Sequence, residues 1–322
     1  STGNMFAFAA NMAPIYPVFI RDAQGNILKD QNGLLRYDYG DGKNAGMVRP
    51  ASPQSNALQL ATLDLNNSEG NAFTGTGYTE ISFLKDFTFT VNAGFGVDET
   101  RSRSINNMYY GQFAPTGGTI SVGHSRSYYF NFQQLLNWNR SFGAHNVNVL
   151  LGHESYLSQS YSVSGYKTNL FSMDNTELNG AVVDGQNAAS SRAEYNNEGY
   201  LARAQYDYDS KVFLSASYRR DASSRFHPDY RWGNFWSFGA GWLINQESWF
   251  NAPWVDMLKV KASVGSQGND SIGNYLYTDL YSISNNEGQI AIAFGSKGNK
   301  EITWETNTNM NAGVDFDLFK GR

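Results

Sequence analysis

Residues 304–318 read Trp304-Glu305-Thr306-Asn307-Thr308-Asn309-Met310-Asn311-Ala312-Gly313-Val314-Asp315-Phe316-Asp317-Leu318. The even positions hold every apolar residue, and the odd positions hold only carboxylates, amides and glycine. Because side chains alternate between the two faces of a strand, this period of two predicts a β-strand with one apolar and one polar face. The stretch runs for about fifteen residues, whereas soluble strands usually stop near five or six.

The same alternation recurs along the chain. It is clear at 87–97, 128–139, 200–208, 212–219, 232–244 and 258–265, and noisier at 71–84 and 145–164. Together with 304–318, these stretches predict about nine long strands. The chain is therefore expected to be all-β.

Composition narrows the class of protein. Of the 322 residues, 16% are charged and 15% are aromatic. The net charge of −5 argues against a nucleic-acid partner. Cysteine is absent, so disulfides and thiolate metal sites are excluded. The sequence has no apolar run of about eighteen residues, the length that marks a transmembrane helix, but strands that cross a membrane give a much weaker hydropathy signal.

The predicted connections alternate in length. Those at 85–86, 142–144 and 209–210 are short, and 246–254 reads as a helix-like link on the same side. The connections at 100–118, 165–192 and 266–301 are long. Short periplasmic turns and long extracellular loops are typical of outer-membrane barrels. We interpret 1–70 as an extracellular loop region with short hairpins and 71–322 as an antiparallel transmembrane β-barrel portion.

The tryptophan spacing agrees with a membrane. Trp232 and Trp242 share one face and lie ten residues apart. That separation is about 33 Å along a strand, and about 25 Å vertically at a tilt of about 40°, which is the height of the apolar band. The tryptophans predicted to lie in interfacial girdles are Trp138, Trp232, Trp242 and Trp304. A soluble sandwich or propeller remains the alternative, since its strands also alternate.

Parity and loop position give the candidate site residues. Charged residues opposite the apolar parity are predicted to face the lumen, and they are Arg203, Arg219, Lys259, Lys261, Glu305, Asp315 and Asp317. Loop aromatics are the substrate-binding candidates, because their rings stack on sugars and pack on peptides. They are Tyr109, Tyr110, Tyr275, Tyr277 and Tyr281. The plainer alternatives are hydration of a lumen and ordinary loop packing.

The sequence carries no catalytic motif. A nucleophile elbow, a P-loop and a His-Glu-x-x-His helix are all missing. His145 and His153 lie eight residues apart. On a strand that is about 27 Å, too far for one metal ion. We therefore predict no catalytic residue, no metal and no cofactor.

A set of ordered motifs resembles a known family. It begins with Arg219-Arg220-Asp221-Ala222-Ser223-Ser224-Arg225-Phe226 and Phe235-Trp236-Ser237-Phe238-Gly239-Ala240-Gly241-Trp242. It continues with Leu258-Lys259-Val260-Lys261-Ala262-Ser263-Val264-Gly265, then Gly268-Asn269-Asp270, and Ile302-Thr303-Trp304-Glu305-Thr306 followed by Gly313-Val314-Asp315-Phe316. Their order and spacing along roughly 70–322 resemble the SusC/RagA-type TonB-linked outer-membrane transporters.

The resemblance implies part of a barrel of about twenty-two strands in a bacterial outer membrane. It implies import of large nutrients, glycans or oligopeptides, and no enzymatic activity. Its expected partners are a SusD-like surface lipoprotein, TonB acting through a plug domain, and outer-membrane lipid. Since no plug or TonB box is recognised, the chain is expected to be an internal piece. A passive porin-like channel and a soluble β-rich glycan-binding or hydrolytic domain are the alternative functions.

Overall fold

A computed structural model describes residues 6, 10, 12–44, 46–50, 56–185 and 188–319. The chain forms two compact units. Unit 1 comprises Ser1–Ala72, Asp98–Arg126 and Tyr161–Arg192, and unit 2 comprises Phe73–Val97, Ser127–Ser160 and Ala193–Arg322. Among the described residues, no helix is long and apolar enough to cross a membrane.

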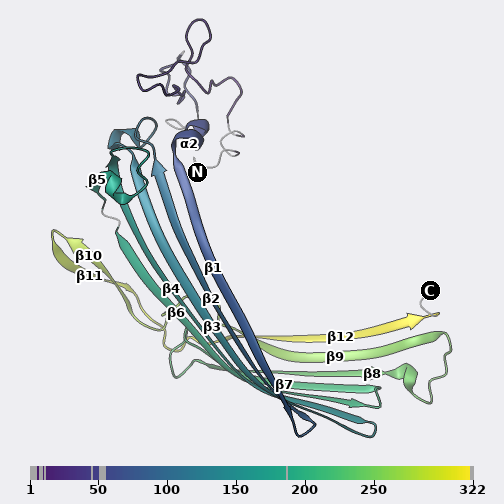
Figure 1. Ribbon diagram of the computed structural model, residues 1–322. Coiled ribbons are helices and arrows are strands. Elements are labelled where there is room, and N and C mark those ends of the chain that lie inside the picture. The colour runs from purple at the N-terminus through teal and green to yellow at the C-terminus, as the bar shows by residue number, and fades with distance from the viewer. Residues whose placement is uncertain are drawn as a thin grey trace. The chain divides into compact units, whose positions relative to one another are not determined.

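One antiparallel sheet dominates the described chain, and most strands pair with their neighbours in sequence (Figure 1). Its order is β1-β2-β3-β4-β6-β7-β8-β9-β12, and β5 pairs with β4 off this path. The strands are β1 Leu65–Phe83, β2 Phe87–Asn106, β3 Thr119–Phe142, β4 His145–Leu170, β5 Ala181–Asp184, β6 Ala189–Tyr208, β7 Val212–Ser223, β8 Trp232–Leu243, β9 Val255–Asn269 and β12 Glu305–Leu318. The predicted all-β, antiparallel fold is confirmed.

The short connections are tight turns that require left-handed backbone. Leu84 and Lys85 have φ of 48° and 62° between β1 and β2, and Asp209 and Ser210 have 51° and 55° between β6 and β7. Positive φ at both central residues is the mark of the hairpin turn whose twist matches that of the strands. Between β3 and β4, Gly143 alone supplies left-handed backbone, with a φ of 61°.

The helix-like connection predicted at 246–254 is wrong. Only a single 3₁₀ turn, η3 Ile244–Gln246, is found there. The Asn245 side chain donates to the carbonyl of Asp256 (2.9 Å) and accepts from the amide of Leu258 (3.1 Å). These two bonds hold the connection against the start of β9.

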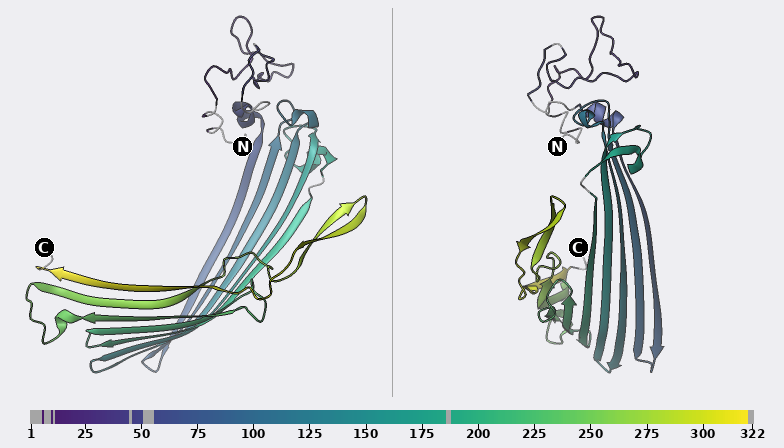
Figure 2. Two further views of the ribbon diagram at one scale, coloured as in Figure 1. Left: turned by 180° about the vertical axis from the view of Figure 1, so that it is seen from behind. Right: turned by 90° about the vertical axis from the view of Figure 1, so that its left-hand side faces the viewer.

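A hairpin interrupts the long connection predicted at 266–301. β10 Leu280–Asn286 and β11 Gln289–Ser296 pair with each other, turning at Glu287 and Gly288, both with positive φ. In Figure 1 and in the left view of Figure 2, the hairpin projects beyond the ends of β9 and β12 that lie opposite the C-terminus. The apolar alternation is only a few residues long on each of these strands, so the sequence predicted a loop at these positions.

Unit 1 is built around a short helix and a small apolar core. Helix α2, Ala57–Leu63, is capped by the Asn56 side chain, which accepts from the amides of Leu58 and Gln59. The core consists of Ile105, Ile120, Leu170 and Ala181. The turns η1 Ala114–Thr116 and η2 Leu178–Gly180 lie in the loops of this unit.

The segment predicted as 1–70 contains isolated bridges, such as Arg21↔Ile27 and Lys29↔Leu35, instead of continuous hairpins. Strand β1 begins at Leu65, whereas the first strand was expected to begin near residue 71. The parts of this segment at 1–5, 7–9, 11, 45 and 51–55 lie outside the described residues. The division at residue 70 stays a prediction.

Candidate functional site

Strand register brings the predicted lumen residues onto one face of the sheet in unit 2. Residues directly opposite in an antiparallel pair share a face. One such row runs Asp207↔Phe213↔Gly241↔Lys261↔Gly313 across β6, β7, β8, β9 and β12. The residues of this parity include Arg203, Arg219, Lys259, Lys261, Glu305, Asp315 and Asp317. We call this the polar face.

The opposite side is apolar. The adjacent row runs Tyr206↔Leu214↔Ala240↔Ala262↔Ala312 across the same strands. We call this the apolar face. The parity expected from the sequence therefore holds across β6, β7, β8, β9 and β12, whereas a lumen on the polar side stays a prediction.

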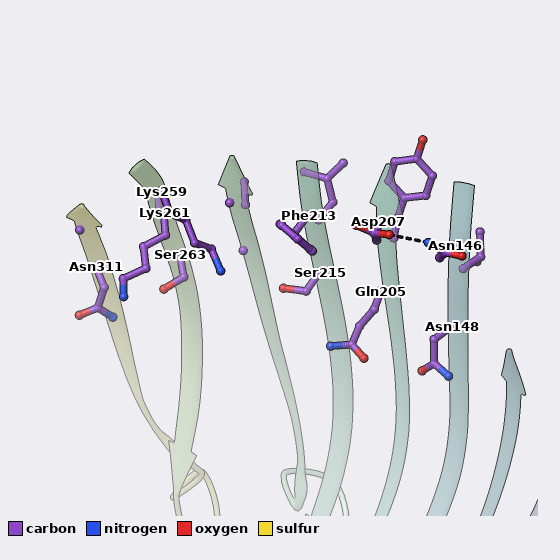
Figure 3. A pocket seen from close by; sticks show the side chains of 18 of the residues that line it. Asn146, Asn148, Gln205, Asp207, Phe213, Ser215, Lys259, Lys261, Ser263 and Asn311 are labelled. Atoms are coloured by element: carbon purple, nitrogen blue, oxygen red, sulfur yellow. Dashed lines mark hydrogen bonds between the residues drawn. The ribbon is translucent and has the colours of Figure 1, made fainter. Parts of the chain in front are cut away.

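A hollow of about 530 Å³ lies on the polar face (Figure 3). Glycines make room for it, because a Cβ on Gly313 would lie 3.1 Å from Lys261 Cε and one on Gly241 would lie 3.3 Å from Lys259 Cε. The lysine stems thus lie over the glycines of the neighbouring strands. The polar side chains that line the hollow include Asn139, Asn146, Asn148, Gln205, Asp207, Ser215, Lys259, Lys261, Ser263 and Asn311.

The charges in this hollow are partly matched. Lys261 Nζ lies 2.8 Å from both carboxylate oxygens of Asp315. Lys259 Nζ lies 5.0 Å from the centre of the Phe213 ring, a cation–π contact. Asp207 accepts from Asn146 at 2.5 Å, and its second oxygen is buried with no hydrogen-bond partner in the described part of the chain. The hollow thus contains amides, ammonium groups and the Asp207 carboxylate, which has one oxygen without a hydrogen-bond partner among the described residues.

A second charge cluster lies elsewhere on the polar face. Arg219 on β7 pairs with Asp221 on the same strand (2.7 Å) and with Glu154 on β4 (2.5 Å). Strand β6 lies between β4 and β7, and its residue at the crossing is Gly199. A Cβ on Gly199 would lie 2.2 Å from Asp221 Oδ1 and 2.9 Å from Arg219 Nη2. The missing side chain is therefore what lets Arg219 reach across a strand.

Polar side chains extend this cluster toward the first strands of unit 2. Gln133 on β3 donates to Glu154, and Asn92 on β2 donates to Gln133 at 2.8 Å. The chain of contacts from Asn92 to Asp221 crosses the polar face from β2 to β7. A network that spans adjacent strands fixes their register as well as their charge balance.

The candidate loop tyrosines of unit 1 are partly engaged. Tyr110 donates its hydroxyl to Asp30, and its ring is half-buried, whereas Tyr109 is exposed. The hydrogen bond from Tyr110 holds the pKa of Asp30 below its ordinary value. Burial, together with the same bond, raises the pKa of Tyr110 to about 12. Tyr110 thus links the first segment of the chain to the β2–β3 loop.

The candidate tyrosines of unit 2 are spread along the β9–β12 connection. Tyr277 meets His227 edge-on at 5.9 Å, and Tyr281 meets Phe294 on the hairpin at 5.6 Å. Tyr275 is exposed and has a φ of 64°. A substrate role for these tyrosines stays a prediction.

The candidate girdle tryptophans have different surroundings. Trp232 and Trp242 lie on the apolar face, opposite Ala222 and Val212. Trp138 packs on Phe87 and Phe142. Trp304 instead packs on Phe226 (5.5 Å) and Phe235 (5.3 Å) and donates to the carbonyl of Arg231.

Phe235 has the parity of the polar face, so Trp304 packs against a residue of that face. For all four tryptophans, the girdle stays a prediction. His145 and His153 have separate contacts: His145 Nδ1 lies 2.7 Å from the Tyr206 hydroxyl, and His153 Nδ1 lies 2.6 Å from Gln134 Oε1.

The sequence alone missed Glu154, Asp221 and Gly199 as members of the polar face. The alternation of glycine with aromatics in 235–242 was a usable signal, since glycine on one face of a strand marks a close approach by a neighbouring side chain. The pairing of Glu154 with Arg219 had no local signal, because the two residues belong to strands that are not adjacent.

Curated relatives are TonB-dependent receptors. The chain is 28% identical over 313 residues to TonB-dependent receptor P39 of Formosa agariphila, covering 92% of this chain and 29% of the relative. It is 26% identical over 347 residues to TonB-dependent receptor SusC of Bacteroides thetaiotaomicron, covering 100% of this chain and 33% of SusC. The chain thus spans about a third of the length of these relatives.

The fold agrees with a solved transporter. The RagAB peptide transporter matches with a TM-score of 0.80 at 23% identity, over 90% of this chain and 32% of that one. The resemblance to SusC/RagA-type proteins expected from the sequence is confirmed. The family described as TonB dependent receptor-like, beta-barrel matches residues 18–322. The chain belongs to this family of outer-membrane β-barrel proteins.

Proposed function

We propose that this chain is part of the barrel wall of a TonB-dependent transporter that imports large nutrients, glycans or oligopeptides, across the outer membrane. The observation that carries the proposal is the polar face, which is continuous in register across β6, β7, β8, β9 and β12 and is backed by rows of apolar residues such as Leu214↔Ala240↔Ala262↔Ala312. A wall with lipid on one side and a hydrated path on the other needs this division.

The polar face would act by physical means. Its hollow combines amide groups, which exchange hydrogen bonds with hydroxyls or peptide groups, with lysines whose stems lie over glycines. Such a surface suits a large polar neighbour, either a plug domain or a passing solute. The loop tyrosines Tyr109, Tyr110, Tyr275, Tyr277 and Tyr281 are the proposed capture residues.

The proposed partners follow from the relatives. A SusD-like lipoprotein would bind at the long loops, and TonB would act through a plug domain. The 26% identity to SusC, which extends over the whole of this chain, supports the proposed partners. RagAB is described as a peptide transporter, which supports oligopeptides as one of the two proposed substrate classes, and glycans are the other.

Uptake of labelled substrates tests the proposal. Cells with and without the gene would be given a fluorescent oligopeptide and a fluorescent malto-oligosaccharide, with and without a protonophore. Energised transport predicts gene-dependent uptake of one class that the protonophore abolishes. Gene-dependent uptake that resists the protonophore would instead favour a passive channel.

A further inference from the structure

The apolar face of unit 2 changes character along its strands. Toward the short turns it carries only apolar side chains at Ala204, Leu214, Ala216, Phe238 and Ala240. The row Ala202↔Tyr218↔Trp236 follows and is rich in aromatic rings. The next row, Tyr200↔Arg220↔Asn234, is the first to contain a charge. The border between hydrocarbon-like and polar surface therefore runs through Arg220.

The depth of this border fits a membrane. On β8, the apolar face extends from Trp242, beside the short connection to β9, to Asn234, eight residues away. Eight residues correspond to about 26 Å along the strand and about 20 Å vertically at a tilt of about 40°. This is close to the apolar band of about 25 Å that outer-membrane barrels present to lipid. Arg220 thus lies where the lipid headgroups begin.

The Arg220 side chain lies over an aromatic ring of the same face. Its guanidinium carbon lies 5.1 Å from the centre of the Trp232 ring, and Trp232 in turn stacks on Tyr200 at 6.2 Å. Stacking fixes the plane of the guanidinium and leaves its N–H groups free at the edges. The residue is exposed.

No carboxylate pairs with Arg220 in the described part of the chain, in contrast to its neighbour Arg219, which binds Glu154 and Asp221 on the other face. The nearby Glu198 is already engaged, since it accepts from Tyr200 at 2.7 Å and lies 3.3 Å from His153. Within the described residues, Arg220 is thus a cation without a partner carboxylate, on the face that we assign to lipid.

We propose that Arg220 and Trp232 form a binding site for the phosphate of an outer-leaflet lipid headgroup. A planar guanidinium donates two parallel hydrogen bonds to phosphate oxygens, and a stacked one is already oriented to do so. An indole at the interface packs on the first atoms below the headgroup. The site is separate from the polar face and does not depend on which solute the protein carries.

Lipid binding tests the site directly. The protein purified from outer membranes in detergent would be titrated with dioleoylphosphatidic acid, and the bound lipid counted by native mass spectrometry. Arg220→Gln is expected to weaken binding by about tenfold or more, because two charge-assisted hydrogen bonds are lost. Arg220→Lys keeps the positive charge but lacks the planar guanidinium, so its lipid binding should fall between that of the unsubstituted protein and that of Arg220→Gln.

The matched control is Arg203→Gln, which removes the same charge from the polar face. It should leave binding of dioleoylphosphatidic acid unchanged. Dioleoylglycerol, which has the same chains without phosphate, should bind weakly to every variant, and inorganic phosphate alone should not compete. Heat-dependent gel mobility checks that each variant is folded.

Two results would overturn the proposal. One is equal binding of the phosphatidic acid by folded Arg220→Gln and the unsubstituted protein. The other is an equal loss in Arg203→Gln, which would mean that the lipid responds to net charge and not to this site.

Discussion

At Gly199 the absence of one methyl group decides which charges meet. Arg219 and Glu154 pair across β6 only because nothing projects from Gly199 toward them. In Gly199→Ala the new Cβ would fall 2.2 Å from Asp221 Oδ1, so the Arg219 cluster must shift. We expect a loss of unfolding free energy of about 1–3 kcal/mol, the usual cost of overpacking a tight site.

The control for this glycine is Gly77→Ala on β1, where a Cβ would meet nothing within 4 Å. That substitution should be neutral or stabilise by about 0.5 kcal/mol, because alanine restricts the unfolded chain. Guanidinium unfolding in detergent, followed by tryptophan fluorescence, measures both variants. Equal midpoints for Gly199→Ala and Gly77→Ala would contradict the proposed crossing.

The hydrogen bond from Tyr110 to Asp30 gives the loops of unit 1 a defined pH window. Because the pKa of Asp30 is lowered on folding, its stabilising contribution is present above its ordinary value of 3.8 and is lost as pH falls through the lower folded value. The pKa of Tyr110 is raised from 10.0 to about 12, so its contribution is complete below 10.0 and is lost as pH rises toward 12.

Protection of residues 22–34 should therefore be greatest between these limits. Limited proteolysis of this segment at a series of pH values measures it, with cleavage expected to rise at both extremes. Tyr110→Phe should raise cleavage at neutral pH and flatten the alkaline rise. An unchanged alkaline profile in this variant would show that another group titrates there.

At the scale of the element, β12 shows how alternating side chains give a strand one apolar and one polar face. Ala312 lies opposite Ala262 on the apolar face, and its neighbour Asn311 lies opposite Ser263 on the polar face. Ala312→Arg should destabilise membrane assembly by about 2–4 kcal/mol if residue 312 meets lipid near the midplane. Asn311→Arg, which places the same side chain in a hydrated setting, should cost much less.

Folding into lipid vesicles at graded urea concentrations compares these two arginine variants. The paired design matters because both variants place the same charged side chain on one strand, at neighbouring positions that face opposite ways. If they shift the folding midpoint equally, the assignment of the apolar face to lipid is wrong.

The sequence predicted the strands well because alternation over ten or more residues is a local signal. β12 was expected as 304–318 and is found as Glu305–Leu318, and the expected tight turns at 85–86 and 209–210 are also found. The parity of Lys259, Lys261 and Asp315 was readable for the same reason. Alternation does not report what lies two strands away, so the pairing of Arg219 with Glu154 was not predictable.

The failures also have physical causes. Strands β10 and β11 are too short for their alternation to stand out from a loop. The link at 246–254 was expected to be helix-like, but the side chain of Asn245 bonds to β9 and the connection is not helical. Trp304 lies one residue before β12 begins, where the strand period no longer fixes its direction, and its place in a girdle stays a prediction.

At the scale of the whole molecule, the sheet edges set the strongest constraint. In the described part of the chain, β1 and β12 end the strand order and each is paired on one side only. Every backbone N–H and C=O on a free edge lacks a partner, and in hydrocarbon each such group costs several kcal/mol. The relatives are about three times as long as this chain, which is length enough for further strands that could pair with such edges.

Residues 1–322 expressed alone should therefore fail to enter a bilayer as a folded monomer. Refolded into lipid vesicles, this chain is expected to aggregate or to remain sensitive to protease, and to run at one gel mobility whether or not it is heated. A longer chain that pairs the outer edges of β1 and β12 should gain both protease resistance and heat-dependent mobility, because closure satisfies every strand edge. A protease-resistant monomer formed by residues 1–322 alone would mean that these strands close on themselves, and the proposal of a larger barrel would then have to be abandoned.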